Sequence, residues 1–209
     1  MILYSYWRST TSLRVRACLT LKGVAYETCP VNLLDGAQRA PDYAALNPVE
    51  GVPTLVLEDG TVLTQSMAIL DWLEDAHPRP ALLPADPVAR AHVRAAAQVI
   101  AMEVHPVNNL KVGAALKARG FDQDGVVDWM CHWMDKGFAA YQRLIDAEGR
   151  FSFGETLTQA DLCLVGQMVN ARRWGLDLAP FARLVEIDEE ARAIPQIAAA
   201  LPEHQPDAQ

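Results

Sequence analysis

Three prolines fall within nine residues, at positions 78, 80 and 84, and they divide the 209-residue chain into two halves of different character. A segment this rich in proline is stiff and extended, as is typical of a linker between domains. Before it, short apolar runs alternate with turn residues, and after it the long segments have helical periodicity. The sequence therefore predicts one domain over residues 1–80 and a second, all-helical domain over residues 87–209.

The first half has the pattern of one small sheet covered by helices. Strand-like runs at 2–6 and 25–31 flank a helix that begins at Ser12, and this connection makes the two strands parallel. Two later runs, 54–57 and 62–63, are joined across Asp-Gly, which is a strong hairpin signal. A second helix is predicted to begin at Ser66.

The second half is predicted to form helices over 87–117, 123–148, 158–174 and 184–200. Asp86 and Pro87 give the first of these an N-cap and a proline at its first position. Pro106 removes a backbone donor and is expected to kink that helix. The polar residues 202–209 are expected to form a loose tail.

Charge is distributed unevenly along the chain. The net charge of −8 argues against nucleic acid as a partner. Residues 1–26, however, contain no acidic residue and carry +4, so the remaining residues carry −12. The four cations of this segment are Arg8, Arg14, Arg16 and Lys22. A cationic stretch in an acidic protein indicates a small anionic ligand.

The sequence also limits the cellular context and the metal chemistry that we expect. No apolar run approaches the roughly 18 residues of a membrane span. The N-terminus begins directly as a strand, without the basic region or cleavage site of a signal peptide, so we expect a cytoplasmic protein without membrane contact. The four cysteines form no C-x-x-C pair and no zinc spacing, so we expect buried, reduced thiols and no metal site.

The first candidate site is the polar run from Arg8 to Ser12, between the first strand and the first helix. The N–H groups of a helix N-terminus attract anions to such a loop. Arg14 and Arg16 follow early in the helix, where cations are unfavourable, and a bound anion would compensate them. A thiolate fits, because a helix N-terminus and nearby cations lower the pKa of a thiol. The alternative is simple N-capping by Ser12 or Thr11.

Two further signals are a proline at the start of a strand and a polar pair at the start of a helix. Pro53 cannot donate to the strand ladder, and a cis bond before it would expose the backbone of Val52 to a ligand. Gln65 and Ser66 offer an amide, a hydroxyl and free N–H groups to a carboxylate. The alternative for this pair is a simple N-cap.

In combination these features resemble the glutathione transferase superfamily, and within it the zeta class, which includes maleylacetoacetate isomerase and maleylpyruvate isomerase. The similarity spans the whole chain. It rests on Tyr4–Ser9 followed by Arg14-Val15-Arg16, on Ala45–Pro48, Leu82–Pro84, His105–Asn109 and Ala160–Val165, and on Gln205-Pro206-Asp207. The resemblance implies an α/β thioredoxin-like N-terminal domain, an all-α C-terminal domain, a homodimer and glutathione as the cofactor. In such a fold we predict that the Val52–Pro53 bond is cis.

The resemblance also implies roles for particular residues. Ser9 matches the position that stabilises the glutathione thiolate, and Arg8, Ser9 and Thr11 form the expected catalytic set. The glutathione contacts that it implies are Ser9, Thr10, Thr11, Gln38, Val52 (through its backbone), Pro53, Gln65, Ser66, His105 and Asn109. Arg8 and Arg173 match positions that bind substrate carboxylates. Arg172 is adjacent to Arg173, so at most one of the two is expected to face the substrate, and His105 has the alternative role of a core histidine beside the proline kink.

One position departs from the zeta pattern. Many members have Ser-Ser-Cys where this chain has Ser9-Thr10-Thr11, so the reacting thiol must come from glutathione. The expected reaction is cis–trans isomerisation of a maleyl keto acid, a small dicarboxylate, to its fumaryl isomer. The sequence leaves maleylpyruvate and maleylacetoacetate open as substrates, with a slight tilt from Thr11 toward the former. The alternatives are a general transferase that conjugates or dehalogenates small electrophiles, and a non-catalytic glutathione-transferase-like binding protein.

Overall fold

The computed structural model describes all residues from 1 to 209 and divides into two compact units. The first unit is Met1–Ala81 together with Ala193–Gln209, and the second is Leu82–Arg192. The sequence predicted a helical domain over 87–209, whereas the structure groups residues 193–209 with the first unit. The reason is hydrogen bonding: Arg16 donates to the carbonyl of Ala200, and the Trp7 N–H donates to Asp207. The expectation of a loose tail is therefore wrong.

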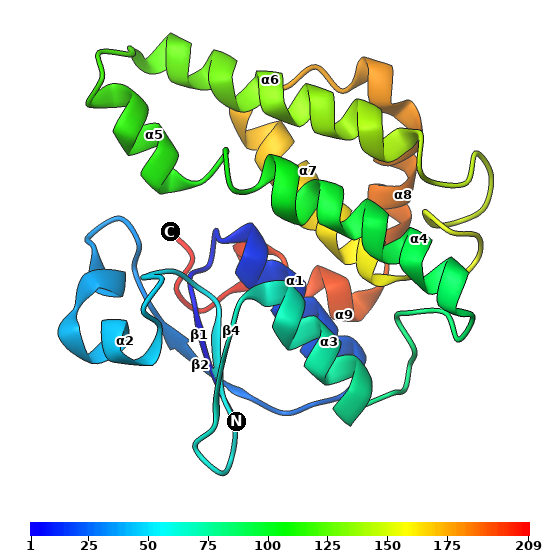
Figure 1. The fold of residues 1–209 in the computed structure, drawn as a ribbon, viewed down its shortest axis with the longest axis horizontal. Coiled ribbons are helices and arrows are strands. Elements are labelled where there is room, and N and C mark those ends of the chain that lie inside the picture. Colours follow the sequence, from blue (N-terminus) through cyan, green and yellow to red (C-terminus); the bar gives the residue numbers. More distant parts are fainter. The chain divides into compact units, whose positions relative to one another are not determined.

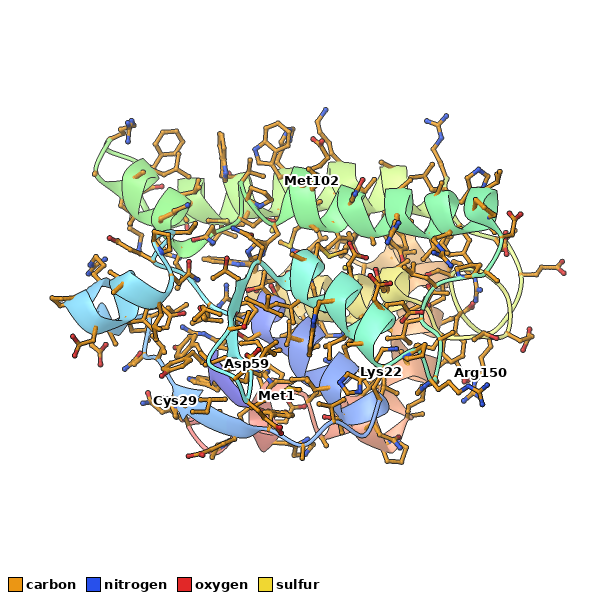
Figure 2. All side chains as sticks on the ribbon, turned by 60° about the horizontal axis from the view of Figure 1, so that its bottom comes forward. Met1, Lys22, Cys29, Asp59, Met102 and Arg150 are labelled. Atoms are coloured by element: carbon orange, nitrogen blue, oxygen red, sulfur yellow. The ribbon has the colours of Figure 1, made fainter.

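The first unit contains a four-stranded mixed sheet in the order β2-β1-β3-β4 (Figure 1). The strands are β1 Ile2–Ser5, β2 Glu27–Pro30, β3 Thr54–Val56 and β4 Val62–Thr64. β1 pairs in parallel with β2 and antiparallel with β3, and β3 and β4 form an antiparallel hairpin. Figure 2 labels Asp59 at the turn of this hairpin. The parallel pair and the hairpin predicted from the sequence are both confirmed.

The helices of the first unit cover both faces of this sheet. They are α1 Thr10–Leu21, α2 Pro41–Leu46, α3 Ser66–Ala76 and the short α9 Pro195–Ala198, with 3₁₀ turns η1 Ala37–Arg39 and η4 Pro202–His204. Successive residues of β1 face opposite ways: Ser5 contacts Arg16 of α1, while the ring of Tyr4 packs 5.6 Å from that of Tyr43 in α2. The two helices accordingly lie on opposite faces, and α3 and α9 pack beside α1 (Figure 1).

The second unit is entirely helical. It contains α4 Pro87–Gln98, a π-helical segment η2 Val99–Val104, α5 Leu110–Lys117, α6 Gln123–Gln142, α7 Gln159–Trp174, a 3₁₀ turn η3 Ala179–Phe181 and α8 Ala182–Arg192. α7 lies at the centre, packed against α4, α6 and α8. It begins where the sequence predicts a capping box, because the Asp161 carboxylate accepts both the N–H and the hydroxyl of Thr158. None of the helices combines the length and apolar character that a bilayer crossing demands.

The structure differs from the sequence prediction at Pro106. Instead of one kinked helix over 87–117, α4 passes into the π-helical segment and the helix then breaks, so that α5 starts afresh from Asn109 as its N-cap. The break is stabilised from α6, since the side-chain amide of Asn108 donates to the carbonyl of Met130 at 3.2 Å. Proline supplies no N–H, and Asn109 caps the helix that starts after the break by accepting the N–H of Lys111.

Candidate functional site

Hydroxyl groups gather at the N-terminus of α1, as the sequence predicts. Ser9 is the N-cap residue, and its Oγ accepts the N–H of Ser12 at 3.2 Å. The structure therefore assigns the capping role to Ser9 rather than to Thr11 or Ser12. Ser9 remains half-buried, and no acidic residue lies in the first turn of α1. The positive end of the helix dipole is thus left for another anion.

Ser9, Thr11 and Val52 are joined in a chain of hydrogen bonds. The Thr11 hydroxyl donates to the carbonyl of Val52 at 2.9 Å, and the oxygens of Ser9 and Thr11 lie 2.9 Å apart. A hydroxyl has one proton. Because Thr11 already donates its one hydroxyl proton to the Val52 carbonyl, Ser9 must be the donor in the bond between Ser9 and Thr11. The Ser9 proton therefore points along the loop, and donation to a thiolate would require the hydroxyl to rotate.

The loop before β3 is fixed by hydrogen bonds from two side chains for which the sequence suggested no role in the site. The Val52–Pro53 bond is cis, which confirms the prediction. Tyr43 and Asn47 both donate to the carbonyl of Gly51, two residues before Pro53. The Asn47 amide also donates to Thr54 at 3.0 Å. Burial raises the pKa of Tyr43, so it stays a neutral donor. The Asn-Pro pair at 47–48 was the available signal, because asparagine before proline is typical of a turn.

Gln65 and Ser66 lie at the start of α3. Gln65 has φ +67°, a conformation that a residue with a side chain rarely adopts, and its side chain makes no capping bond. The amide of Gln65 is exposed, whereas Ser66 is 6% exposed and its Oγ accepts a hydrogen bond from Nη1 of Arg14 at 3.3 Å. The first N–H groups of α3 therefore have no side-chain cap from Gln65. Unusual backbone strain of this kind is commonly found at ligand sites.

The four cations of residues 1–26 have different environments. Lys22 pairs with Glu74 at 2.9 Å and is part of the fold. Arg16 is also internal, bound by backbone carbonyls. Arg8 is half-buried, with its guanidinium 5.3 Å from the ring centre of Trp7 and its Nε without a hydrogen-bond partner. The cations that remain for a ligand are Arg8 and Arg14.

Two further glutathione contacts predicted from the sequence, Thr10 and Gln38, also lie in the first unit. Thr10 is only 3% exposed, as the first residue of α1. Gln38 lies in η1, and its Oε1 is buried without a hydrogen-bond partner. The contacts of Thr10 and Gln38 with glutathione remain predictions. Two open grooves, of about 450 and 480 Å³, lie on helices of the second unit, and no predicted site residue lines either of them.

The second unit separates the two adjacent arginines. Arg172 forms an ion pair with Asp188 at 2.6 Å, and Arg192 approaches the same carboxylate oxygen at 3.2 Å. Burial raises the pKa of Asp188, although both arginines oppose that shift. Arg172 therefore belongs to the packing of α7 on α8. Arg173 is exposed, with its guanidinium 4.9 Å from the ring centre of Trp174.

His105 and Asn109 lie in the segment between η2 and α5. His105 is half-buried directly after the π-helical segment, and its N–H donates to the carbonyl of Ile100 at 2.9 Å. The side chain of Asn109 caps α5 by accepting the N–H of Lys111 at 3.2 Å. Both residues therefore have local structural roles, and their predicted contacts with glutathione remain predictions.

Known proteins resemble this chain over its full length. Residues 8–76 match the family described as glutathione S-transferase, N-terminal domain. A maleylacetoacetate isomerase of Pseudomonas aeruginosa is 42% identical over 209 residues, covering 99% of this chain and 98% of the relative. The holo structure of a maleylpyruvate isomerase, described as a bacterial zeta-class glutathione S-transferase, superimposes with a TM-score of 0.97 at 41% identity and full coverage of both chains. A maleylacetoacetate isomerase of Methylobacterium extorquens AM1, solved with malonate and glutathione bound, gives a TM-score of 0.96 at 37% identity, again with full coverage of both.

Proposed function

Because the chain belongs to the zeta class of glutathione transferases, the family of the maleylacetoacetate and maleylpyruvate isomerases, we propose that it is a glutathione-dependent isomerase of a maleyl keto acid. The product is the trans, fumaryl isomer. The observation that carries the proposal is the hydroxyl chain at the start of α1, where Ser9 lies at a helix N-terminus without acidic neighbours. The bound ligands of the similar structures, glutathione and a dicarboxylate, agree with this chemistry.

The residues of this chain fit glutathione at three places. Ser9 offers a hydroxyl and the N-terminus of α1 to the thiol. Val52, whose carbonyl accepts the Thr11 hydroxyl in the same hydrogen-bonded chain, offers its backbone beside Pro53. Gln65 and Ser66 offer an amide, a hydroxyl and helix N–H groups to the γ-glutamyl end. Thr10, Gln38, His105 and Asn109 are further proposed contacts, supported by the family resemblance.

The chemistry needs little from the protein beyond charge and position. When bound, glutathione supplies a thiolate that adds reversibly to the cis double bond and leaves once the central bond has turned. Ser9 and the N-terminus of α1 lower the pKa of the thiol, since both favour its charged form. Arg8, next to Ser9 in the sequence, stabilises the negative charge that develops on the keto oxygen.

A dicarboxylate substrate also requires cations, and we propose Arg8 and Arg173 for this role. Arginine suits it because the guanidinium stays charged and binds carboxylates through two parallel hydrogen bonds. The ion pair of Arg172 with Asp188 supports the choice of Arg173 over its neighbour. We further propose, from the family resemblance, that the protein is a cytoplasmic homodimer, with residues 1–80 as the core of the glutathione-binding domain and the helices of the second unit, Leu82–Arg192, binding the substrate. Light scattering would test the dimer by giving twice the mass of one chain.

The proposed reaction is tested by mixing the protein with each acid, maleylpyruvate or maleylacetoacetate, with and without glutathione, and following loss of the enol absorbance. We expect conversion of at least one acid, and only when glutathione is present. The relative kcat/KM values then identify the preferred substrate. No conversion of either acid, or equal conversion without any thiol, would refute the proposal.

A further inference from the structure

Two arginines of α1, two residues apart, are both buried. Arg14 is 1% exposed and Arg16 is fully buried. A buried cation is costly unless hydrogen bonds or an opposite charge compensate it. The two side chains share a helix and a charge, so the difference in how each is compensated indicates what each is for.

Arg16 is fully satisfied by its own fold. Its Nε and Nη2 donate to the carbonyl of Ala200 at 3.1 and 2.9 Å, and its Nη1 donates to Ser5 Oγ at 2.9 Å. Further bonds reach the carbonyls of Tyr6 and Trp7. Burial lowers the pKa of Arg16 to about 10, so the side chain remains charged at neutral pH. Arg16 therefore has a structural role.

Arg14 is almost unsatisfied. Its one hydrogen bond runs from Nη1 to Ser66 Oγ at 3.3 Å, while its Nε and Nη2 are buried without any hydrogen-bond partner. No carboxylate of the chain forms an ion pair with it. This positive charge, held beside the first residue of α3, has no negative partner in the protein.

The bond from Arg14 sets the direction of the Ser66 hydroxyl. A guanidinium only donates, so Ser66 Oγ is the acceptor and its own proton is left to donate to a ligand. Ser66 is also the first residue of the 11-residue helix α3, which receives no cap from the side chain of Gln65. A hydroxyl proton, the helix N–H groups and a buried positive charge thus converge, and a carboxylate is the group that all three favour.

We propose that Arg14 is the buried counter-charge for a carboxylate bound at Ser66. On the proposed function, on which this inference rests, that group is the α-carboxylate of the γ-glutamyl residue of glutathione. Arg14 is a positioning residue that acts through Ser66. Its hydrogen bond to Ser66 Oγ directs the hydroxyl proton toward the ligand, and its positive charge favours a bound carboxylate. The cation without a partner is thereby explained as half of an ion pair that the ligand completes.

The test compares two ligands by calorimetry, without any keto acid present. One is glutathione, and the other is 4-aminobutyryl-cysteinyl-glycine, the same tripeptide without the α-carboxylate. We expect Arg14→Met to weaken glutathione binding by about tenfold or more, and binding of the analogue by less than about twofold. Arg14→Gln should behave in the same way, and Arg14→Lys, which keeps the charge, should recover part of the lost affinity. An equal loss for both ligands, or no loss for either, would overturn the inference.

Lys22→Met is the matched control. Lys22 is a buried cation at the other end of α1, labelled in Figure 2, but it already has Glu74 as its partner. Its removal should lower the unfolding temperature and leave the ratio of the two affinities unchanged. If Arg14→Met does not fold, Arg14→Gln decides the question by the same ratio. The Arg14 variants could lose more affinity for glutathione than for the analogue while the wild-type protein isomerises neither acid. That result would refute the proposed function and leave this inference standing.

Discussion

Ser9 combines two roles in one side chain. Its oxygen caps α1 by accepting the Ser12 N–H, and its proton is donated to Thr11 in the absence of a thiolate. Thr11 in turn is tied to the carbonyl of Val52. The hydroxyl of Ser9 is thus preorganised but not free, and turning it toward a thiolate exchanges one hydrogen bond for a stronger, charge-assisted one.

Ser9→Ala should raise the pKa of the bound glutathione thiol and reduce turnover about tenfold to a hundredfold, because a hydrogen bond to a charged group contributes about 1.5–3 kcal/mol. The measurement is the pH dependence of kcat/KM together with ultraviolet titration of the bound thiol. Ser9→Thr keeps both the cap and a hydroxyl and is the control. The additional change Thr11→Val should make Ser9→Ala worse. Full activity in Ser9→Ala would show that Ser9 is only a helix cap.

The backbone of Gln65 suggests a conflict between stability and binding. Its φ of +67° is unfavourable for any residue with a side chain. Gln65→Gly should relieve strain of about 1–3 kcal/mol, less the 0.5–1 kcal/mol or so that glycine costs in chain entropy. We therefore expect a higher free energy of unfolding in urea and, at the same time, weaker binding of glutathione. If the variant is less stable than the wild type, the strain is not real.

At the scale of elements, short-range signals predicted the fold well. The hairpin at Asp59-Gly60, the cap at Asp86 and the capping box at Thr158 each depend on neighbouring residues, and each forms where predicted. The long-range contacts could not be predicted in this way. Arg16 and Ala200 are 184 residues apart in the sequence, and no local pattern shows that a polar tail returns to the first sheet. The sequence predicted only a kink at Pro106, where the structure has a break. The hydrogen bond from Asn108 to α6 that stabilises the break is a tertiary contact, which no local pattern shows.

The returning tail leads to a prediction about the active loop. Asp207 accepts the N–H of Trp7 at 3.0 Å, directly before Arg8 and Ser9. Asp207→Ala leaves that N–H without its partner, which should lower the free energy of unfolding by about 1 kcal/mol. Because the same contact anchors the loop, kcat should fall as well. Urea denaturation and steady-state kinetics measure the two effects, and Glu203→Ala, an exposed change in the same tail, is the control. If Asp207→Ala behaves like this control, the tail does not support the loop.

At the scale of the molecule, the sequence predicted the family because its motifs extend from Tyr4 to Asp207, and full-length similarity at about 40% identity confirms it. The site was predicted less completely. The sequence suggested no role in the site for Tyr43 and Asn47, and it marked Arg14 only as an early helix cation that a bound anion would compensate. Their importance comes from hydrogen bonds across the first unit.

The proposed carboxylate contacts distinguish an isomerase from a general transferase. Arg8→Ala and Arg173→Ala should each lower kcat/KM for the maleyl keto acid by about tenfold or more, since each removes a charge-assisted contact. Conjugation of a neutral electrophile should change little. Arg172→Ala should instead lower the free energy of unfolding, because it leaves buried Asp188 with one partner fewer. A parallel loss of isomerisation and conjugation would mean that Arg8 and Arg173 serve glutathione or the fold.

The central claim is that glutathione is returned unchanged after each reaction, and the balance of free thiol tests it most directly. The protein is mixed with a maleyl keto acid in large excess over glutathione, and both the fumaryl product and the remaining thiol are measured over time. An isomerase makes many product molecules for each glutathione, while the thiol concentration stays constant. A transferase consumes one thiol for each substrate molecule and stops when the glutathione is exhausted, and that result would contradict the proposed isomerase mechanism.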